Sequence, residues 1–322
     1  MMKQEGKKPL VILTGPTAVG KSALAVELAE RIGGEIISAD SMQVYRHMDI
    51  GSAKITVQEM AGIPHHLIDV LDPTDEFNVV VFQRMARAAA QEIYDRGHIP
   101  ILAGGTGFYI QAVLYDIDFT ENDEDTALRS TLEEAARKEG PAVLYERLKT
   151  IDPVSCESIH ANNIKRVIRA IEFYEKTGQR ISEHNREQRE RLSPYNFAYF
   201  VLLDDREKIY GKIEERVDLM LAQGLVEEVS ALRDMGCTKD MVSMQGLGYK
   251  EILSCLEGEI SLEEAVYRIK RDTRHFAKRQ LTWFRREKEV IWVDKREFDY
   301  SSQKILLFMQ GILREKDILL QK

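Results

Sequence analysis

A glycine-rich octapeptide restricts the fold of this 322-residue chain more than any other feature. The segment Gly15-Pro-Thr-Ala-Val-Gly-Lys-Ser22 follows the pattern GxxxxGK(S/T), in which glycines let the backbone wrap around an anion. A helix amino terminus and Lys21 would add positive charge, and Ser22 could hold Mg²⁺. The pattern predicts a diphosphate site but does not say whether the diphosphate belongs to a nucleotide. The alternative is a plain glycine turn between a strand and a helix.

The neighbouring segments favour the phosphate-loop interpretation. Residues 9–15 form an apolar run rich in branched side chains, as in a buried parallel strand. Residues 21–34 have apolar side chains at helical spacing and end in two glycines. Strand, helix and strand patterns then follow at residues 35–40, 79–96 and 98–107. This alternation predicts an α/β fold, a P-loop core with a parallel sheet.

From about residue 116 the pattern changes to helices with little strand signal. Residues 121–139 are acidic and helical in pattern, and residues 141–191 contain further helices, until residues 199–205 restore a strand pattern. We therefore predict that residues 1–115 and 196–322 form the α/β core with C-terminal helices. Residues 116–195 are predicted to form a helical insertion domain.

Composition narrows the class of protein. No apolar run reaches the roughly 18–20 residues that span a bilayer, and the amino terminus lacks an apolar signal region. The three cysteines lie far apart, which argues against disulfides or a cysteine-rich zinc site. We expect a cytoplasmic protein that does not enter a membrane.

Positive charge is concentrated in two segments, although the formal net charge is −8. Residues 160–191 contain eight Lys/Arg against five Asp/Glu, and residues 268–286 contain eight against one. In the second segment the basic side chains recur at helical spacing among aromatic ones, at Arg268, Arg271, His275, Lys278 and Arg279. Such a stripe suits a nucleic-acid backbone. The alternative for both segments is a solvated face.

Two further positions should lie at the same sheet edge as the phosphate loop. Asp40 ends the second predicted strand, and the turn Gly104-Gly105-Thr106 ends the third. Asp40 could hold Mg²⁺ through water, act as a general base, or cap the following turn, and the pattern leaves all three open. The turn with Thr106 could position a substrate or simply begin a helix.

Several longer motifs occur together and in one order. They are GPTAVGKS (15–22), DSMQVYRHMDIGSAK (40–54), PHHLIDVLDP (64–73), AGGTGFY (103–109), HANNIKRVIRAIE (160–172), KIEERVDLMLAQGLVEEV (212–229) and QGLGYKE (245–251). With these motifs the chain resembles the bacterial tRNA dimethylallyltransferases, also called isopentenyl-tRNA transferases. The resemblance extends from Gly15 to about Arg286.

The resemblance implies a prenyl transfer. Such enzymes move the dimethylallyl group from dimethylallyl diphosphate to the exocyclic amine of the adenosine 3′-adjacent to the anticodon, and release diphosphate. It implies Asp40 as the general base, Thr106 as a group that positions the transition state or the acceptor, and Arg216 as a group that steadies the diphosphate. The loop pattern assigns Ser22 as the ligand of an Mg²⁺ cofactor. We expect a monomer.

The resemblance implies two sets of binding residues. Those implied for the donor diphosphate are Gly15, Pro16, Thr17, Ala18, Val19, Gly20, Lys21 and Ser22. Those implied for the anticodon stem-loop of tRNA are Asp40, Ser41, Met42, Gln43, Thr106, Arg129, Ile164, Lys165, Arg166, Gln245, Gly246, Gly248 and Tyr249.

The chemistry of the implied reaction agrees with these residue types. An adenine amine is a poor nucleophile, so a base must take its proton as the new bond forms. The departing diphosphate develops negative charge that cations and backbone N–H groups stabilise. Two other classes use the same loop: an ATP-dependent small-molecule kinase and a nucleotide-switched RNA-binding protein. A kinase should carry an arginine-rich lid, and no segment stands out as one.

Overall fold

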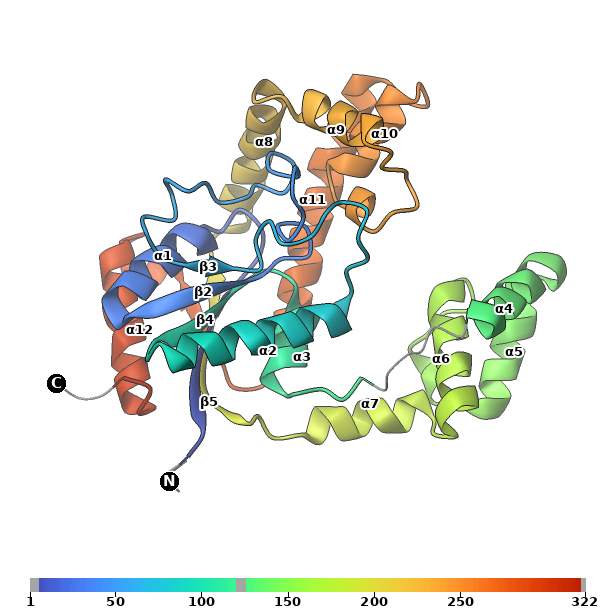
Figure 1. Ribbon diagram of the computed structural model, residues 1–322, viewed down its shortest axis with the longest axis horizontal. Helices are drawn as coiled ribbons and strands as arrows, with labels where there is room; N and C mark the ends of the chain where they lie inside the picture. Colours follow the sequence, from blue (N-terminus) through green and yellow to red (C-terminus); the bar gives the residue numbers. More distant parts are fainter. Residues whose placement is uncertain (1–5, 120–125, 320–322) are drawn as a thin grey trace. The chain divides into compact units, whose positions relative to one another are not determined.

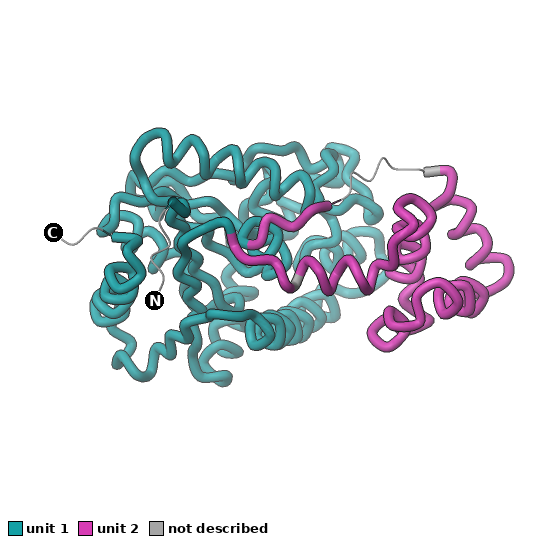
Figure 2. The backbone as a smooth tube through the Cα atoms, turned by 90° about the horizontal axis from the view of Figure 1, so that it is seen from below, with its two compact units in different colours: residues 1–114, 194–322 teal, residues 115–193 magenta. Residues whose placement is uncertain are grey.

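The computed structural model describes residues 6–119 and 126–319. Contacts divide the chain into two compact units, residues 1–114 with 194–322, and residues 115–193 (Figure 2). We refer to these as unit 1 and unit 2. The acidic residues 121–125 of the predicted 121–139 helix lie outside the described residues.

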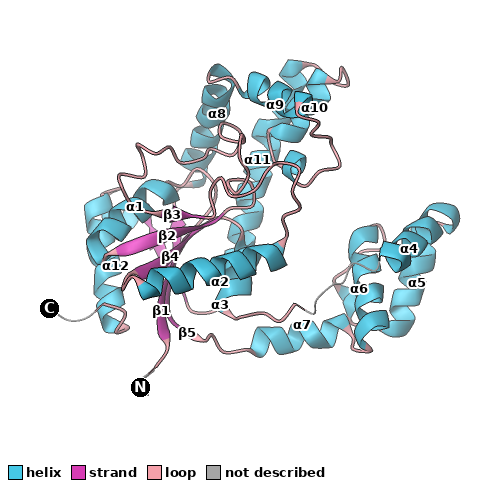
Figure 3. Cartoon of the chain, in the orientation of Figure 1, coloured by secondary structure: helices cyan, strands magenta, loops and turns pink. Residues whose placement is uncertain are grey.

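Unit 1 contains a parallel sheet, which confirms the predicted α/β class (Figure 3). In the described residues its strand order is β3-β2-β4-β1-β5-β6, and every pair of neighbours is parallel. The strands are β1 (Lys8–Thr14), β2 (Gly34–Ala39), β3 (His65–His66), β4 (Ile99–Gly104), β5 (Tyr195–Leu203) and β6 (Val290–Asp294).

Helices cover both faces of this sheet (Figure 1). Their bounds in unit 1 are α1 (Lys21–Ile32), α2 (Val79–Asp95), α3 (Gly107–Leu114), α8 (Arg206–Ala222), α9 (Leu225–Asp234), α10 (Tyr249–Leu256), α11 (Leu262–Phe284) and α12 (Ser302–Glu315). Short 3₁₀ turns are η2 (Ser243–Gln245) and η3 (Lys295–Phe298).

Strand alternation explains this cover. Val11 and Leu13 of β1 are fully buried in a cluster with α1 and α12. Leu10 and Ile12, which alternate with them along the strand, are equally buried. Successive side chains of a strand point to opposite faces, so both faces of β1 need a layer of helices. Each fully buried side chain of this size stabilises the fold by roughly 1.5–3 kcal/mol.

Unit 2 is a helical bundle with its own core. Its helices are α4 (Thr126–Glu139), α5 (Pro141–Ile151), α6 (Ile164–Thr177) and α7 (Ile181–Glu190), with a 3₁₀ turn η1 (Ser155–Glu157). Leu132, Leu148 and Ile171 meet in its core. Buried Asp152 accepts hydrogen bonds from Ser155 and Ser182, which ties the α5–η1 connection to the start of α7.

Candidate active site

The register of three neighbouring strands brings the predicted site together. Thr14 at the end of β1 and Ala39 at the end of β2 both pair with Gly104 at the end of β4. The chain therefore leaves all three strands at one edge of the sheet, where neighbouring backbones lie about 4.8 Å apart. This places the phosphate loop, the turn with Thr106 and Asp40 side by side, as the sequence predicts.

The phosphate loop has a shape that requires its two glycines. Gly15 has a φ of 148°, and a Cβ there would lie 2.7 Å from the Leu202 carbonyl oxygen. Gly20 has a left-handed φ of 94° immediately before α1. Lys21 Nζ donates to the Pro16 carbonyl at 2.8 Å, across the mouth of the loop. These features agree with an anion-binding loop at a helix amino terminus.

The other loop residues divide between packing and solvent. Ala18 and Val19 are buried, so their side chains pack under the loop and only their backbone can face a ligand. Ser22 is exposed in the first turn of α1. The Thr17 N–H donates to the Gln280 side chain at 2.8 Å, a contact that the sequence motif did not predict.

Three charged groups converge at this edge. Partial burial and the nearby charge of Arg216 lower the pKa of Lys21 to about 8, while Asp40 acts in the opposite direction. Burial lowers the pKa of Arg216, and Asp40 and Glu59 oppose that shift. Among the described residues no carboxylate forms an ion pair with Arg216. The site therefore holds two cations, Lys21 and Arg216, close to Asp40, with Glu59 near Arg216. The two cations suit a diphosphate.

Asp40 and Thr106 present polar atoms at the same edge. Asp40 Oδ1 accepts the Met42 N–H at 2.9 Å, so the carboxylate does cap the following turn. Its second oxygen has no protein partner within the described part of the chain. The Thr106 N–H donates to the Ala39 carbonyl at 3.2 Å, which fixes the turn beside β2. The Thr106 hydroxyl makes no hydrogen bond to any described residue, so it does not act as the cap of α3.

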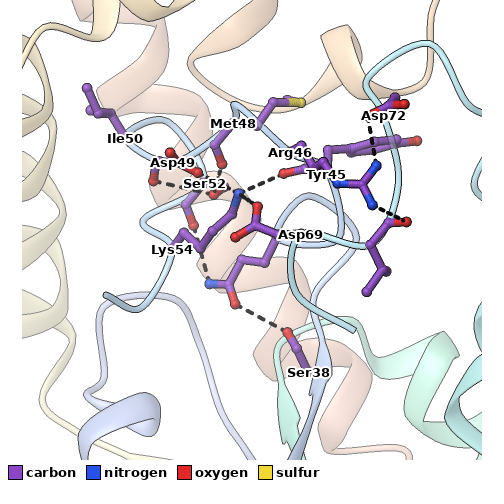
Figure 4. Close-up of polar contacts among 12 residues, drawn as sticks. Ser38, Tyr45, Arg46, Met48, Asp49, Ile50, Ser52, Lys54, Asp69 and Asp72 are labelled. Carbon is purple, nitrogen blue, oxygen red and sulfur yellow. Dashed lines mark hydrogen bonds and ion pairs between the residues drawn. The ribbon is translucent and has the colours of Figure 1, made fainter. Parts of the chain in front are cut away.

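The DSMQ motif opens a loop, residues 40–54, that buried polar groups organise (Figure 4). The Gln43 side chain accepts from Ser38 at 3.2 Å and donates to the Ala53 carbonyl at 3.3 Å. The nearly buried ammonium of Lys54 contacts Asp49 and Asp69 at 2.6 and 2.5 Å. This network gives loop 40–54 a fixed shape without regular secondary structure.

A carboxylate on α9 holds the far end of the same loop. Glu228 accepts the backbone N–H groups of Asp49, Ile50 and Gly51 at 2.8, 2.8 and 3.0 Å. The Tyr249 hydroxyl donates to the same carboxylate at 2.9 Å. Glu228 carries no local sequence signal for this role, because its backbone partners are 177–179 residues away along the chain.

The QGLGYKE motif lies against this loop. A Cβ on Gly246 would meet the Met42 sulfur at 2.8 Å, and one on Gly51 would meet the Tyr249 ring at 2.6 Å. Tyr249 is fully buried, and Gly248 before it has a φ of 96°. Tyr249 thus lies beneath the loop rather than on the surface, and among the predicted tRNA contacts of this motif Gln245 is the exposed one.

Helix α11 carries the predicted basic stripe, and its two halves differ. Arg268, Arg271 and Arg274 pair with carboxylates at 2.6–2.8 Å. Nearer the carboxyl end, basic side chains line a surface hollow of about 480 Å³. Lys278, Arg279 and Arg286 have no carboxylate partner in the described residues, whereas His275 lies 3.8 Å from Asp272. The residues that line this hollow are His275, Lys278, Arg279, Thr282, Trp283 and Arg286.

The predicted tRNA contacts in unit 2 form a second basic cluster. Lys165 and Arg166 are exposed in the first turn of α6, which begins at Ile164. Arg129 forms a two-pronged pair with Glu172 at 3.1 and 2.9 Å. Desolvation and then the charges of Arg129 and Arg166 lower the pKa of Arg169. Several guanidinium groups therefore crowd around one carboxylate, which leaves this face of unit 2 positive.

Comparison with known proteins decides the family. The family model described as IPP transferase matches residues 43–287, and the model described as isopentenyl transferase matches residues 8–72. The chain belongs to the IPP transferase family. A tRNA dimethylallyltransferase of Lachnoclostridium phytofermentans is 62% identical over 97% of this chain and 99% of its own.

Solved members of the IPP transferase family share the fold. A tRNA isopentenylpyrophosphate transferase from Bacillus halodurans is 44% identical, with a TM-score of 0.72 over 97% of this chain and 98% of its own. A eukaryotic dimethylallyltransferase acting on tRNA is 32% identical, with a TM-score of 0.78 over 89% of this chain and 74% of its own. None of the described helices is long and apolar enough to cross a membrane.

Proposed function

We propose that this chain transfers the dimethylallyl group from dimethylallyl diphosphate to the exocyclic amine of the adenosine next to the anticodon in tRNA. The observation that carries the proposal is the meeting of Lys21, Arg216 and Asp40 beside the unpartnered Thr106 hydroxyl. Two cations suit a departing diphosphate, and one carboxylate suits the proton of an amine. Membership of the IPP transferase family supports the same reaction.

In this reaction the protein stabilises charge on the donor. As the bond between the allylic carbon and the diphosphate oxygen breaks, negative charge develops on the leaving group. Lys21, Arg216 and the backbone N–H groups of the phosphate loop are arranged to receive it. Because these groups are fixed before the reaction, little reorganisation accompanies charge development.

Asp40 acts on the acceptor. The adenine amine is a weak nucleophile because its lone pair is delocalised into the ring. As nitrogen forms its bond to the allylic carbon, the unpartnered oxygen of Asp40 takes the proton. The Thr106 hydroxyl orients the amine or the bridging oxygen of the donor. The base must leave its stack to reach this edge, so we propose that it is extruded from the anticodon loop.

The loop also fits a magnesium ion. Mg²⁺ in phosphate sites takes one or two protein oxygens together with phosphate oxygens and water. Ser22 is exposed in the first turn of α1, where the pattern of this loop puts the metal ligand. Asp40 follows β2, which β4 separates from β1 in the sheet. When bound, Mg²⁺ would neutralise charge on the diphosphate. We propose Ser22 as its protein ligand.

The tRNA would contact exposed polar groups rather than buried ones. We propose phosphate contacts from Lys278, Arg279 and Arg286 in the hollow of α11, and from Lys165 and Arg166 in unit 2. The buried residues Gly246, Gly248 and Tyr249 would act by supporting loop 40–54. The kinase alternative receives no support from the comparisons, whose named members are transferases acting on tRNA.

One incubation tests the proposed function. Unmodified tRNA is mixed with the protein, Mg²⁺ and either dimethylallyl diphosphate or ATP, and the digested nucleosides are analysed by mass. We expect one C₅H₈ increment on an adenosine with dimethylallyl diphosphate and no change with ATP. Absence of any increment at saturating substrates would refute the proposal. A mixture without the protein serves as the control for non-enzymatic transfer.

A further inference from the structure

A buried amide on α11 connects the two turns that carry the candidate catalytic groups. Gln280 is 6% exposed. Its Oε1 accepts the Thr17 N–H of the phosphate loop at 2.8 Å, and its Nε2 donates to the Gly105 carbonyl at 3.0 Å. Thr17 lies four residues before Lys21, and Gly105 immediately precedes Thr106. One side chain thus contacts both the donor loop and the acceptor turn.

The backbone of the turn that carries Thr106 approaches α11 closely. A Cβ on Gly105 would lie 2.2 Å from Gln280 Nε2, so the turn needs glycine where the amide approaches. One turn of α11 later, the Trp283 ring lies 2.3 Å from where a Gly107 Cβ would be. Helix α11 therefore packs directly against the backbone on both sides of Thr106.

The two hydrogen bonds demand a particular chemical group. One contact needs an acceptor for an N–H and the other needs a donor to a carbonyl, at the same time and from one planar group. A carboxamide supplies both. A carboxylate would accept from Thr17 but would repel the Gly105 carbonyl, and a thioether of the same length would make neither bond.

We propose that Gln280 is a positioning residue that fixes the spacing between the phosphate loop and the turn that carries Thr106. The inference rests on the proposed function, because that spacing sets how the allylic carbon meets the adenine amine. An error of about 1 Å in such an arrangement can lower a rate by about 10²-fold. Gln280 itself need not touch either substrate.

The test compares Gln280→Met with wild type in single-turnover transfer at saturating substrates. Methionine keeps the volume and removes both hydrogen bonds. We expect the rate to fall roughly 10–100-fold, in line with a misplacement of that kind, while the tRNA dissociation constant changes less than twofold. A rate within twofold of wild type would overturn the inference.

Gln83→Met is the matched control. Gln83 is also buried in unit 1, and its amide donates to the Ala112 carbonyl at 2.8 Å, away from the phosphate loop. We expect this variant to lose thermal stability and keep its single-turnover rate. If both variants lose rate to the same degree, Gln280 has a merely structural role and the inference fails.

A second variant, Gln280→Glu, gives a readout that a structural role would not move. When protonated, the carboxylic acid reproduces both the acceptor and the donor of the amide. The ratio of its rate to that of wild type should therefore rise as the pH is lowered, because only the protonated acid donates to the Gly105 carbonyl. A ratio independent of pH overturns the inference, even if Gln280→Met does not fold. Wild type without transfer activity would instead refute the proposed function.

Discussion

Strand β2 carries one acidic residue at each end, and the two have opposite surroundings. Glu35, near its start, is almost fully buried and contacts Arg96 at 2.8 and 2.7 Å, His66 at 2.7 Å and His98 at 2.7 Å. Asp40, just past its end, is half-buried and accepts one backbone N–H. The carboxylate at the start of the strand is therefore saturated, since both oxygens have protein partners. The carboxylate past its end is open, since one oxygen lacks a protein partner in the described residues.

This difference separates a stabilising acid from a reactive one. Every oxygen of Glu35 is engaged, and the hydrogen bond from Arg96, opposed by burial and assisted by the histidines, lowers its pKa to about 2. Such a group stays ionised and has no free lone pair directed at a substrate. Asp40 keeps one oxygen without a protein partner in the described residues, beside the cations of the phosphate loop.

The largest effect that we expect comes from Asp40→Asn. Asparagine can still accept the Met42 N–H, so the turn should persist, but it is a far weaker proton acceptor. Positioned proton transfer typically contributes about 10²–10⁴-fold to a rate. We expect the single-turnover rate to fall by that factor, while both substrates bind within a few-fold of wild type. Quench-flow measurement at saturating substrates checks the rate.

The same experiment across a magnesium titration separates the alternatives for Asp40. A ligand role for Mg²⁺ predicts that high metal concentration largely restores the rate. A capping role predicts lower thermal stability with near-normal activity in the folded fraction. Either outcome would contradict the general-base assignment.

Glu35→Gln should have the converse effect: a loss of stability without a loss of rate. In the native state the pKa of Glu35 is lowered from 4.5 to about 2, which corresponds to about 3 kcal/mol of stability. Because the shift is downward, this stability is present above about pH 4.5 and disappears as the pH falls toward 2.

Urea unfolding between pH 2 and 7 checks this expectation. Wild type should lose about 3 kcal/mol of unfolding free energy over that acidic range from this one group, and the variant should lack that component. A variant as stable as wild type at pH 7 would show that the four contacts of Glu35 contribute little. A large fall in the transfer rate of Glu35→Gln would contradict the assignment of Glu35 as a stabilising acid and Asp40 as the reactive one.

The contrast also shows which parts of the molecule sequence patterns could reveal. The phosphate loop, Asp40 and Thr106 were predictable because each follows an apolar run, and parallel strands end at a common edge. Helix α2 and the final glycine of β4 were equally predictable from local periodicity and turn chemistry. In all these cases, the information lies within a few neighbouring residues.

Contacts between distant segments were not predictable. The partners of Glu35 lie 31–63 residues away from it, and Gln280 lies 263 residues from Thr17. Strand β5 was predicted to begin at Tyr199 but begins at Tyr195, because pairing with β1 extends it: Lys8 pairs with Tyr195. The two-residue strand β3 exists through its pairing with β2 and has no pattern of its own. In both strands, tertiary contacts override the local propensity of the sequence.

A smaller effect is expected at the cation beside Asp40. The lowered pKa of Lys21, about 8, means that its ammonium loses its proton in a mildly alkaline solution. A diphosphate binds the charged form, so affinity should be nearly constant below about pH 7 and weaken by up to about tenfold between pH 7 and 9. Calorimetric titration of dimethylallyl diphosphate without tRNA measures this. Lys21→Arg should keep binding independent of pH, and a wild-type affinity that is flat to pH 9.5 would contradict the assignment.

The smallest effect that we expect concerns the cations of α11, which also differ in whether a carboxylate partner is present. Arg271 is paired with Asp272 at 2.8 and 3.0 Å, whereas Lys278 has no carboxylate partner in the described residues and lines the hollow. Each phosphate contact that is lost lowers the salt dependence of RNA binding by about 0.7–0.9 of a slope unit. We expect Lys278→Gln to weaken tRNA binding a few-fold and to reduce the slope by that amount, because a cation without a carboxylate partner can exchange its counterion for a phosphate.

Arg271→Gln, the matched control on the same helix, should leave the slope unchanged, because Asp272 already neutralises that guanidinium. Anisotropy titrations with labelled tRNA from 50 to 300 mM salt compare the two variants. Equal slopes for both would show that partner saturation does not decide which cations bind the RNA.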